Sequence, residues 1–306
     1  MKVFVTGGAG FIGSALINKM VENHYVKIYD NLSFGNKKFL NISDNDFILG
    51  DILDEEKLLG ALIAFQPDIV IHLAAIHFIP YCNLYPFESA NINIKGTLNV
   101  INAIKLVPSI KKFFFASTAA VYPIHDFPIS ENLSPKPLDI YGLSKLTGEE
   151  ICKTFFLETS IPTIICRFFN AFGPNETNDH LIPAIQNQLL EGNFSIKLGN
   201  TSPKRDFIHT YDMADAVLLL LEKFNSGIEI FNLGSGVEYS VLEVIESFQK
   251  ILDKKISVEI DQSKVRKSDR PHLVADINKI SNFLQWQPKI DLEMGLRTLL
   301  NFKLND

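Results

Sequence analysis

The start of the chain places three glycines between a short hydrophobic strand and an amphipathic helix. Residues 3–5 favour a strand, and residues 11–20 have the apolar spacing of a helix. Gly7 permits a tight bend, Gly10 allows backbone N–H groups to approach a pyrophosphate, and Gly13 allows close packing of the helix on the strand. The helix N-terminus adds unpaired donors and partial positive charge. We therefore predict a dinucleotide-binding turn rather than a simple loop. The residues assigned to it are Gly7, Gly10, Phe11, Ile12 and Gly13.

Strands and helices alternate along the first half of the chain. Several of the strands are continuous apolar runs, which is typical of a parallel sheet buried on both faces. The alternation predicts an α/β fold with a Rossmann-type doubly wound parallel sheet. Predicted strands occupy residues 26–30, 47–52, 67–75, 112–118 and 162–167, and predicted helices occupy residues 54–65, 88–105 and 140–153.

The second half of the chain has longer loops and a weaker alternation of strands and helices. We place the main boundary near residue 170, so that residues 1–170 form the Rossmann domain that binds the dinucleotide. Residues 171–306 would form a smaller C-terminal α/β domain that covers the substrate. Segments near residues 205–233 are expected to return to the first domain, with short strands at 207–209 and 228–233.

Composition and charge exclude several classes of protein. At 306 residues and a net charge of −6, the chain lacks the clustered Lys and Arg that nucleic-acid binding needs. Cys82, Cys152 and Cys166 lack metal-ligand spacing, so we expect no metal site and a reducing compartment. Apolar runs such as residues 69–75 and 216–221 are too short to span a bilayer, and glycine interrupts the apolar start that a signal peptide requires. We expect a soluble cytoplasmic protein with no nucleic-acid or membrane partner.

Asp30 ends the second predicted strand, seventeen residues after Gly13. A carboxylate at about this spacing binds the ribose hydroxyls of the adenosine in dinucleotide-binding folds. It would also repel the 2′-phosphate of NADP, so NAD is the favoured cofactor, and an Asp that caps a turn is the alternative. Ligands of doubly wound sheets bind at the carboxyl ends of strands. The residues expected at the same edge are Asp51, Ala74, Ala75 and Thr118.

Tyr141 and Lys145 are four residues apart in a predicted helix, so their side chains share one face. A phenol with a pKa near 10 is a poor base at neutral pH. A nearby ammonium group and a positive nicotinamide ring would lower that pKa and allow Tyr141 to remove a proton from an alcohol. Thr118 would hydrogen-bond the same oxygen, and Lys145 would also bind ribose hydroxyls. The pattern predicts hydride transfer to NAD, and a surface Tyr–Lys pair is the alternative.

These motifs together resemble the extended short-chain dehydrogenase/reductase family, in its NAD-dependent nucleotide-sugar epimerase and dehydratase branch. The resemblance runs through nearly the whole chain. It rests on residues 6–13, 30–31, 51–52, 72–75, 117–118, 121–122, 141–145, 167–170, 205–209, 232–236 and 266–276.

The resemblance implies a role for each matching residue. The catalytic residues would be Thr118, Tyr141 and Lys145. NAD contacts would come from the glycine turn, Tyr141, Lys145, Asp30, Asn31, Asp51, Ile52, Leu73, Ala74 and Ala75. A nucleotide-diphosphate sugar would be held by Thr118, Asn170, Arg205, Arg266 and Asp269. Two arginines suit a pyrophosphate, because they form charge-assisted, forked hydrogen bonds. The resemblance also implies a homodimer, joined through the helices that begin near Glu88 and Tyr141.

The two residues after Thr118 bear on which reaction of this family to expect. Dehydratases of the family generally carry an acidic pair there, because elimination of water needs a general acid and a general base. Here the pair is Ala119–Ala120, which disfavours 4,6-dehydration. We therefore expect an NAD-dependent nucleotide-diphosphate-sugar 4-epimerase that forms a 4-keto intermediate and returns the hydride to the same sugar.

Other interpretations of the same residues remain open. A reductase, dehydratase or decarboxylase of the same family would use the same cofactor site. A catalytically silent nucleotide-binding regulator is a further alternative, although it has no need of Thr118, Tyr141 and Lys145 together. His77 is a loop histidine with no visible partner, so we interpret it as structural or solvated rather than as a sugar contact.

Overall fold

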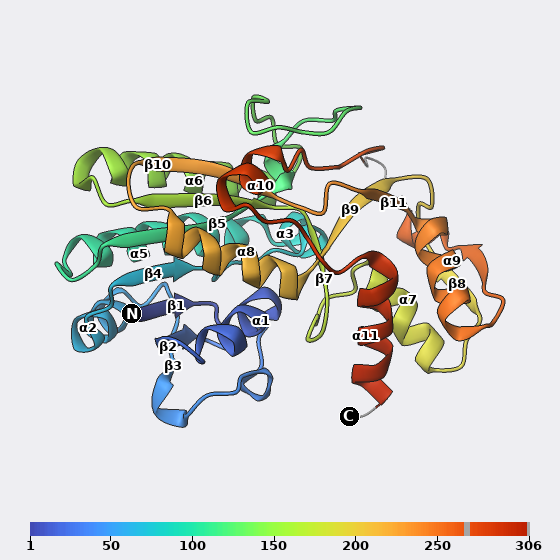
Figure 1. The fold of residues 1–306 in the computed structure, drawn as a ribbon, viewed down its shortest axis with the longest axis horizontal. Helices are drawn as coiled ribbons and strands as arrows, with labels where there is room; N and C mark the ends of the chain where they lie inside the picture. Colours follow the sequence, from blue (N-terminus) through green and yellow to red (C-terminus); the bar gives the residue numbers. More distant parts are fainter. Residues whose placement is uncertain (266–269, 305–306) are drawn as a thin grey trace.

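The computed structural model describes residues 1–265 and 270–304 and is built around a seven-stranded parallel sheet (Figure 1). The strands lie in the order β10-β6-β5-β4-β1-β2-β3. Their bounds are β1 Lys2–Thr6, β2 Tyr25–Asp30, β3 Phe47–Leu49, β4 Ile69–His72, β5 Lys112–Thr118, β6 Thr163–Phe168 and β10 Ile228–Leu233. All neighbouring pairs in this sheet are parallel. The predicted Rossmann-type doubly wound fold is confirmed.

Helices cover both faces of this sheet, because neighbouring residues of each strand point to opposite sides. On one side, Val3 and Val5 of β1 pack in a core shared with α1 (Phe11–Met20), α8 (Thr210–Lys223) and α10 (Asn278–Leu284). On the other side, Phe4 packs in a core shared with α2 (Glu55–Phe65), α5 (Gly96–Lys105) and α6 (Ile140–Thr159). Figure 1 shows α1 and α8 side by side on the same face. Burial on both faces explains why these strands are almost entirely apolar.

A second group of elements, on the right in Figure 1, packs around its own apolar core. It contains a three-stranded sheet in the order β11-β9-β7 and a two-stranded sheet of β12 and β8. These strands are β7 Asn170–Phe172, β8 Ser195–Leu198, β9 Lys204–His209, β11 Glu238–Ser240 and β12 Ser257–Ile260. The helices are α7 Leu181–Leu190, α9 Val241–Leu252 and α11 Leu292–Leu304. The strand predicted at residues 207–209 is therefore β9, although it pairs with β7 and β11 instead of the main sheet. The division of the chain at residue 170 stays a prediction.

Several elements differ from the sequence-based expectation. The strand predicted at residues 67–75 is shorter, as β4, and the helix predicted at residues 140–153 continues to Thr159 as α6. The single helix predicted at residues 88–105 is three pieces: α4 (Pro86–Ala90), a wide turn of π-helix at Asn91–Lys95, and α5. The strand predicted at residues 47–52 ends at Leu49, because Asp51 Oδ1 accepts a hydrogen bond from the backbone N of Leu53 (2.8 Å) and turns the chain. Among the described residues, no helix combines the length and the apolar character needed to cross a membrane.

Candidate active site

The glycine-rich turn between β1 and α1 leaves almost no room for side chains. Gly7 has a φ of +75°, and a Cβ at this position would lie 2.4 Å from the backbone N of Ala74. A Cβ on Gly13 would lie 2.4 Å from the carbonyl oxygen of Gly7. Gly10 is the N-cap of α1, and as a glycine it has no side chain that could bond the first N–H groups of the helix. The turn is therefore a backbone cradle that fits a pyrophosphate.

A single cleft of about 1040 Å³ runs from this turn past the strand ends to the second group of elements. Its size is at the upper end for small-molecule sites, which suits a dinucleotide together with a second ligand. The predicted site residues that line it are Gly7, Gly10, Phe11, Ile12, Gly13, Asp30, Asn31, Asp51, Ile52, Leu73, Ala74, Ala75, Thr118, Tyr141, Lys145, Asn170 and Arg205. The other two predicted residues, Arg266 and Asp269, lie outside the described residues. The cleft thus brings together every predicted site residue that the structure describes.

Two acidic side chains stand at the end of the cleft beside β2 and β3. Asp30 accepts hydrogen bonds from the backbone N of Ala9 (2.9 Å) and of Leu32 (2.8 Å). Burial raises the pKa of Asp30, and these two hydrogen bonds partly offset that effect. Asp51 accepts a hydrogen bond from Asn31 Nδ2 (2.8 Å). Asp30 therefore fixes the glycine turn while its remaining lone pairs stay available to hydroxyl donors.

Thr118, Tyr141 and Lys145 meet at the carboxyl end of β5. Thr118 is the last residue of that strand, and Tyr141 and Lys145 lie in the first two turns of α6. Asp139 caps this helix by accepting a hydrogen bond from the backbone N of Gly142 (2.7 Å). Lys145 Nζ donates to the carbonyl oxygen of Ala116 (2.8 Å), two residues before Thr118. One strand end and one capped helix therefore hold the three side chains beside the cleft.

Burial dominates the acid–base properties of this trio. It raises the pKa of the Tyr141 hydroxyl, although a hydrogen bond with Thr118 acts in the opposite direction. Burial also lowers the pKa of Lys145 to about 8. Desolvation disfavours both charged forms at once. The expectation that Lys145 and a positive nicotinamide ring together lower the pKa of Tyr141 stays a prediction.

Asn93 connects the cleft wall to the helix that carries Tyr141 and Lys145. Its Oδ1 accepts from the backbone N of Ile76 (2.8 Å), and its Nδ2 donates to the carbonyl oxygen of Ile76 (2.9 Å) and to Ser144 Oγ (3.0 Å). Asn93 lies in the π-helical turn at Asn91–Lys95, which departs from regular α-helix at this buried contact. Asn93 therefore links the loop that contains Ile76 to α6, the helix that carries Tyr141 and Lys145.

Two cleft residues were not assigned to the site from the sequence. Arg270 is buried and lines the cleft beside Arg205, whose Nη1 donates to the carbonyl oxygen of Arg270 (2.7 Å). Arg270 Nη2 donates to the carbonyl oxygens of Ala120 (3.0 Å) and Tyr122 (3.2 Å). His77, which has no visible partner in the sequence, lines the cleft with its Nε2 3.3 Å from Asn178 Nδ2. No sequence spacing could pair residues so far apart along the chain.

Comparison with known proteins identifies the family. The model of the NAD dependent epimerase/dehydratase family matches residues 3–234, which include the glycine turn, Thr118, Tyr141 and Lys145. The chain belongs to the NAD-dependent epimerase/dehydratase family. Members of this family are enzymes that depend on NAD, so the predictions of an enzyme and of NAD as its cofactor are confirmed. The backbone cradle of the turn fits that cofactor.

Similar members of the family are epimerases of nucleotide sugars. The UDP-glucose 4-epimerase of Rhizobium meliloti is 30% identical over 95% of this chain and 93% of its own length. The crystal structure of the Thermotoga maritima UDP-glucose 4-epimerase with UDP-glucose is 29% identical, with a TM-score of 0.90 over 100% of this chain and 99% of that one. The Bacillus cereus UDP-glucuronic acid 4-epimerase, with UDP-glucuronic acid and NAD, is 29% identical with a TM-score of 0.89 over the same shares.

Proposed function

We propose that this protein is an NAD-dependent nucleotide-diphosphate-sugar 4-epimerase. The observation that carries the proposal is one continuous cleft that joins the glycine cradle to Thr118, Tyr141 and Lys145. Ala119 and Ala120, which follow Thr118, have no group that could move a proton, and this disfavours dehydration. The similar family members that act on UDP-sugars support the same assignment.

Each of the three residues has a distinct part in the proposed reaction. NAD, when bound, would supply the hydride acceptor and donor together with a positive ring charge. Tyr141 would take the proton of the C4 hydroxyl during oxidation and return a proton to that oxygen after the 4-keto sugar has turned its other face. Thr118 would hydrogen-bond the same oxygen, and Lys145 would bind ribose hydroxyls of the cofactor.

The remaining contacts would hold the two ligands in place. We propose that the glycine turn, Asp30, Asn31, Asp51, Ile52 and residues 73–75 bind NAD, as their position along the cleft supports. Asn170 and Arg205, together with Arg266 and Asp269, would bind the nucleotide diphosphate and its ribose. Arginine suits this role because its planar fork matches phosphate oxygens.

The reaction is tested by supplying a panel of UDP-, GDP-, CDP- and dTDP-sugars and identifying the products by mass spectrometry and NMR. The expected product is the C4 epimer of one substrate, with no net reduction of NAD. Accumulation of NADH together with a 4-keto or decarboxylated sugar would contradict the proposal. Steady consumption of added NADH or NADPH would point instead to a reductase.

Replacement of Asp30 should relax the choice between NAD and NADP. Two unit charges about 4 Å apart repel by about 1 kcal/mol in water and about 4 kcal/mol at an effective dielectric of 20. Asp30→Asn keeps an acceptor oxygen but removes the charge, so the NAD-to-NADP affinity ratio should fall at least about fivefold. Calorimetric titration with each cofactor measures the ratio. Asp44→Ala, at a highly exposed carboxylate of the same region, is the control and should leave it unchanged.

We also propose that the protein is a homodimer joined through α4, α5 and α6. This layer of helices exposes several apolar side chains: Phe87 is 91% and Leu157 80% exposed, and Leu98 and Leu143 are exposed as well. Apolar groups gathered on one side favour a protein interface. A cytoplasmic location is a further proposal, supported by the three unpaired cysteines.

A charge in the proposed interface should separate the two subunits. We expect Leu157→Glu to convert the dimer to a monomer, because the new carboxylate would have to be buried without a partner. Light scattering coupled to size-exclusion chromatography measures the mass. Leu242→Glu, at an exposed residue of α9 outside this layer, should leave the mass unchanged. If both variants have the mass of the wild type, the interface lies elsewhere or the protein is a monomer.

A further inference from the structure

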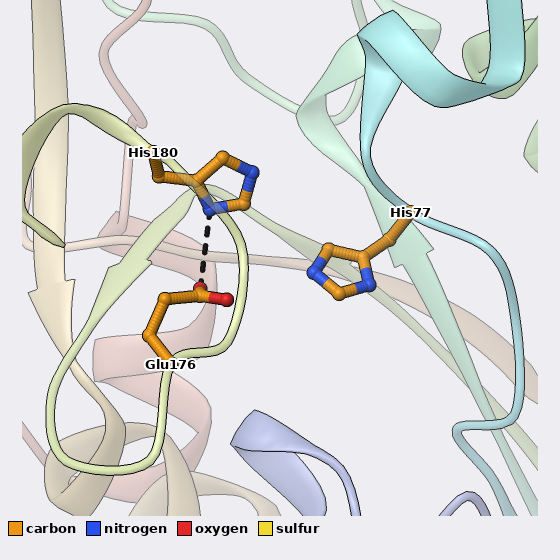
Figure 2. Close-up of side chains that lie close together, drawn as sticks. All are labelled: His77, Glu176 and His180. Carbon is orange, nitrogen blue, oxygen red and sulfur yellow. Dashed lines mark hydrogen bonds and ion pairs between the residues drawn. The ribbon is translucent and has the colours of Figure 1, made fainter. Parts of the chain in front are cut away.

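Three side chains that can ligate a metal converge on the cleft, apart from the proposed cofactor and catalytic residues. His77 extends from the loop between β4 and α3 (Ile79–Leu84), and Glu176 and His180 extend from the loop between β7 and α7. Figure 2 shows them facing one another across the space between the two loops. One donor atom from each lies within 4.8 Å of the other two. All three residues line the cleft.

Hydrogen-bonding contacts already link the members of this cluster. His180 Nδ1 lies 3.1 Å from Glu176 Oε2. The amide Nδ2 of Asn178 lies 3.3 Å from both His77 Nε2 and Glu176 Oε1, and as a donor it marks both of these atoms as acceptors. One NH₂ group thus serves an imidazole of one loop and the carboxylate of the other. A cation, in place of the Asn178 amide, could also bind His77 Nε2 and a carboxylate oxygen of Glu176 together.

The residue types also suit metal binding. Metal ligands must be neutral imidazoles and an ionised carboxylate. Two histidines and one glutamate supply this donor set from two loops.

We infer that His77, Glu176 and His180 bind a divalent transition-metal ion, with Zn²⁺ the best match to the donor set. Two imidazoles and one carboxylate are the protein ligands of zinc sites that keep an open coordination position. Hard cations such as Mg²⁺ favour oxygen ligands and water, so they fit two histidines poorly. The open position would face the cleft and take water or an oxygen atom of a molecule bound there.

Binding requires a small closure of the two loops. In a tetrahedral site with bonds of about 2.0–2.1 Å, the donor atoms stand about 3.4 Å apart. Because the donor atoms lie within 4.8 Å of one another, the widest separation has to shrink by at most about 1.4 Å. The loop between β7 and α7 also contacts the glycine-turn side of the cleft. Asn175 Nδ2 lies 3.2 Å from Ser14 Oγ, and Thr177 Oγ1 donates to the carbonyl oxygen of Phe34 (3.1 Å). A metal ion would add a further link, from the loop between β7 and α7 to the loop that carries His77.

Metal binding is tested on the full chain after removal of metal with a chelator. Calorimetric titration with ZnCl₂, without any sugar present, should show one site per chain, and MgCl₂ should not replace it. His180→Ala should weaken Zn²⁺ binding at least about 100-fold, since loss of an outer-shell partner alone costs 10–100-fold. His180→Cys should retain binding, because a thiolate also ligates zinc. Circular dichroism shows whether each variant is folded.

A histidine elsewhere in the chain is the matched control. His125→Ala removes an imidazole that lies in the loop before α6 and contacts Phe127, so Zn²⁺ affinity should equal that of the wild type. The inference is overturned if the wild type binds no Zn²⁺, or if wild type and folded His180→Ala bind it equally. Because no sugar is present, this result is independent of the proposed epimerase reaction.

Discussion

Tyr141→Phe should slow sugar epimerisation by about 10²–10⁴-fold while the protein remains folded and retains its cofactor. That range is the usual contribution of a positioned acid–base group. Tyr141 carries a phenol hydroxyl, lies at the start of α6 and lines the cleft. Removal of its oxygen leaves the ring in place, so packing around α6 is preserved. The rate is measured as kcat on the nucleotide sugar that the product panel identifies.

The control for this variant is the same substitution at an exposed tyrosine. Tyr25 is 77% exposed at the start of β2, so Tyr25→Phe should leave kcat unchanged. Retention of full activity in Tyr141→Phe would show that another group moves the proton. His77 would then be the group to replace next, because it lines the same cleft. Cofactor content measured on each preparation separates a catalytic loss from a loss of NAD.

The sequence was sufficient to predict the sheet and the cofactor end of the cleft. Continuous apolar strands and a glycine turn reflect local rules, and the carboxyl ends of parallel strands meet at one edge. Asp30, Thr118 and Tyr141 could therefore be placed together before any contact was known, and all three line the cleft. The roles assigned to them stay predictions.

The rest of the site depends on contacts between distant loops. His77 faces Glu176 only because the loops after β4 and β7 meet across the cleft, and no sequence periodicity encodes that meeting. Arg270 was missed for a similar reason, since its burial follows from packing against Ala120 and Tyr122. The sequence alone also does not give burial, which raises the pKa of Tyr141.

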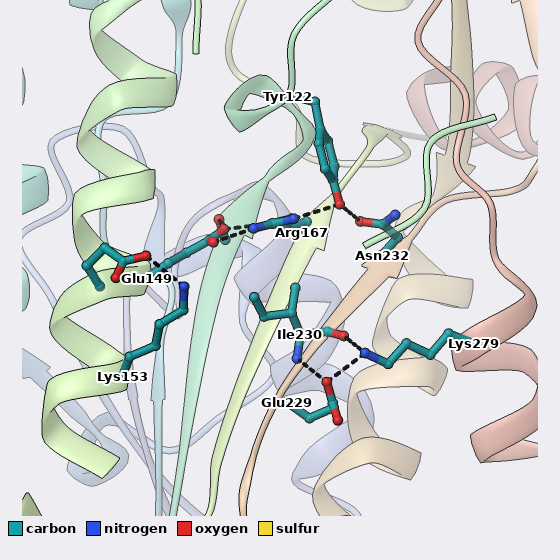
Figure 3. A network of polar contacts seen from close by, with 10 residues as sticks. Tyr122, Glu149, Lys153, Arg167, Glu229, Ile230, Asn232 and Lys279 are labelled. Carbon is teal, nitrogen blue, oxygen red and sulfur yellow. Dashed lines mark hydrogen bonds and ion pairs between the residues drawn. The ribbon is translucent and has the colours of Figure 1, made fainter. Parts of the chain in front are cut away.

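A buried ion pair beneath the trio was likewise invisible in the sequence. Arg167 donates from Nε to Glu149 Oε1 (2.9 Å) and from Nη2 to Glu149 Oε2 (2.6 Å), with both side chains almost fully enclosed. Figure 3 shows how the network continues from Arg167 Nη1 to the hydroxyl of Tyr122 (2.8 Å) and from there to Asn232 Oδ1 (2.7 Å). Ser117, next to Thr118, also donates to Glu149. The pair thus joins α6 to β5 and β6 below the cleft.

Arg167→Met should lower the free energy of unfolding by about 3–5 kcal/mol. Removal of one partner leaves the Glu149 carboxylate buried without a countercharge, which is much more costly than loss of the pair itself. Acid that protonates the buried carboxylate would remove the unpaired charge, so the loss of stability should be smaller at acidic pH. Urea unfolding followed by circular dichroism, at neutral and at acidic pH, measures both effects.

An exposed pair on the same helix provides the matched control. Lys153 Nζ lies 2.7 Å from Glu150 Oε1 at the surface of α6, and Lys153→Met should change stability by no more than about 1 kcal/mol. The double variant Arg167→Met/Glu149→Leu should recover much of the lost stability, because no charge remains buried. If Arg167→Met is as stable as Lys153→Met at both pH values, the buried pair does not hold α6 against the sheet. A cycle of these variants therefore separates the cost of an unpaired charge from the loss of packing around Arg167.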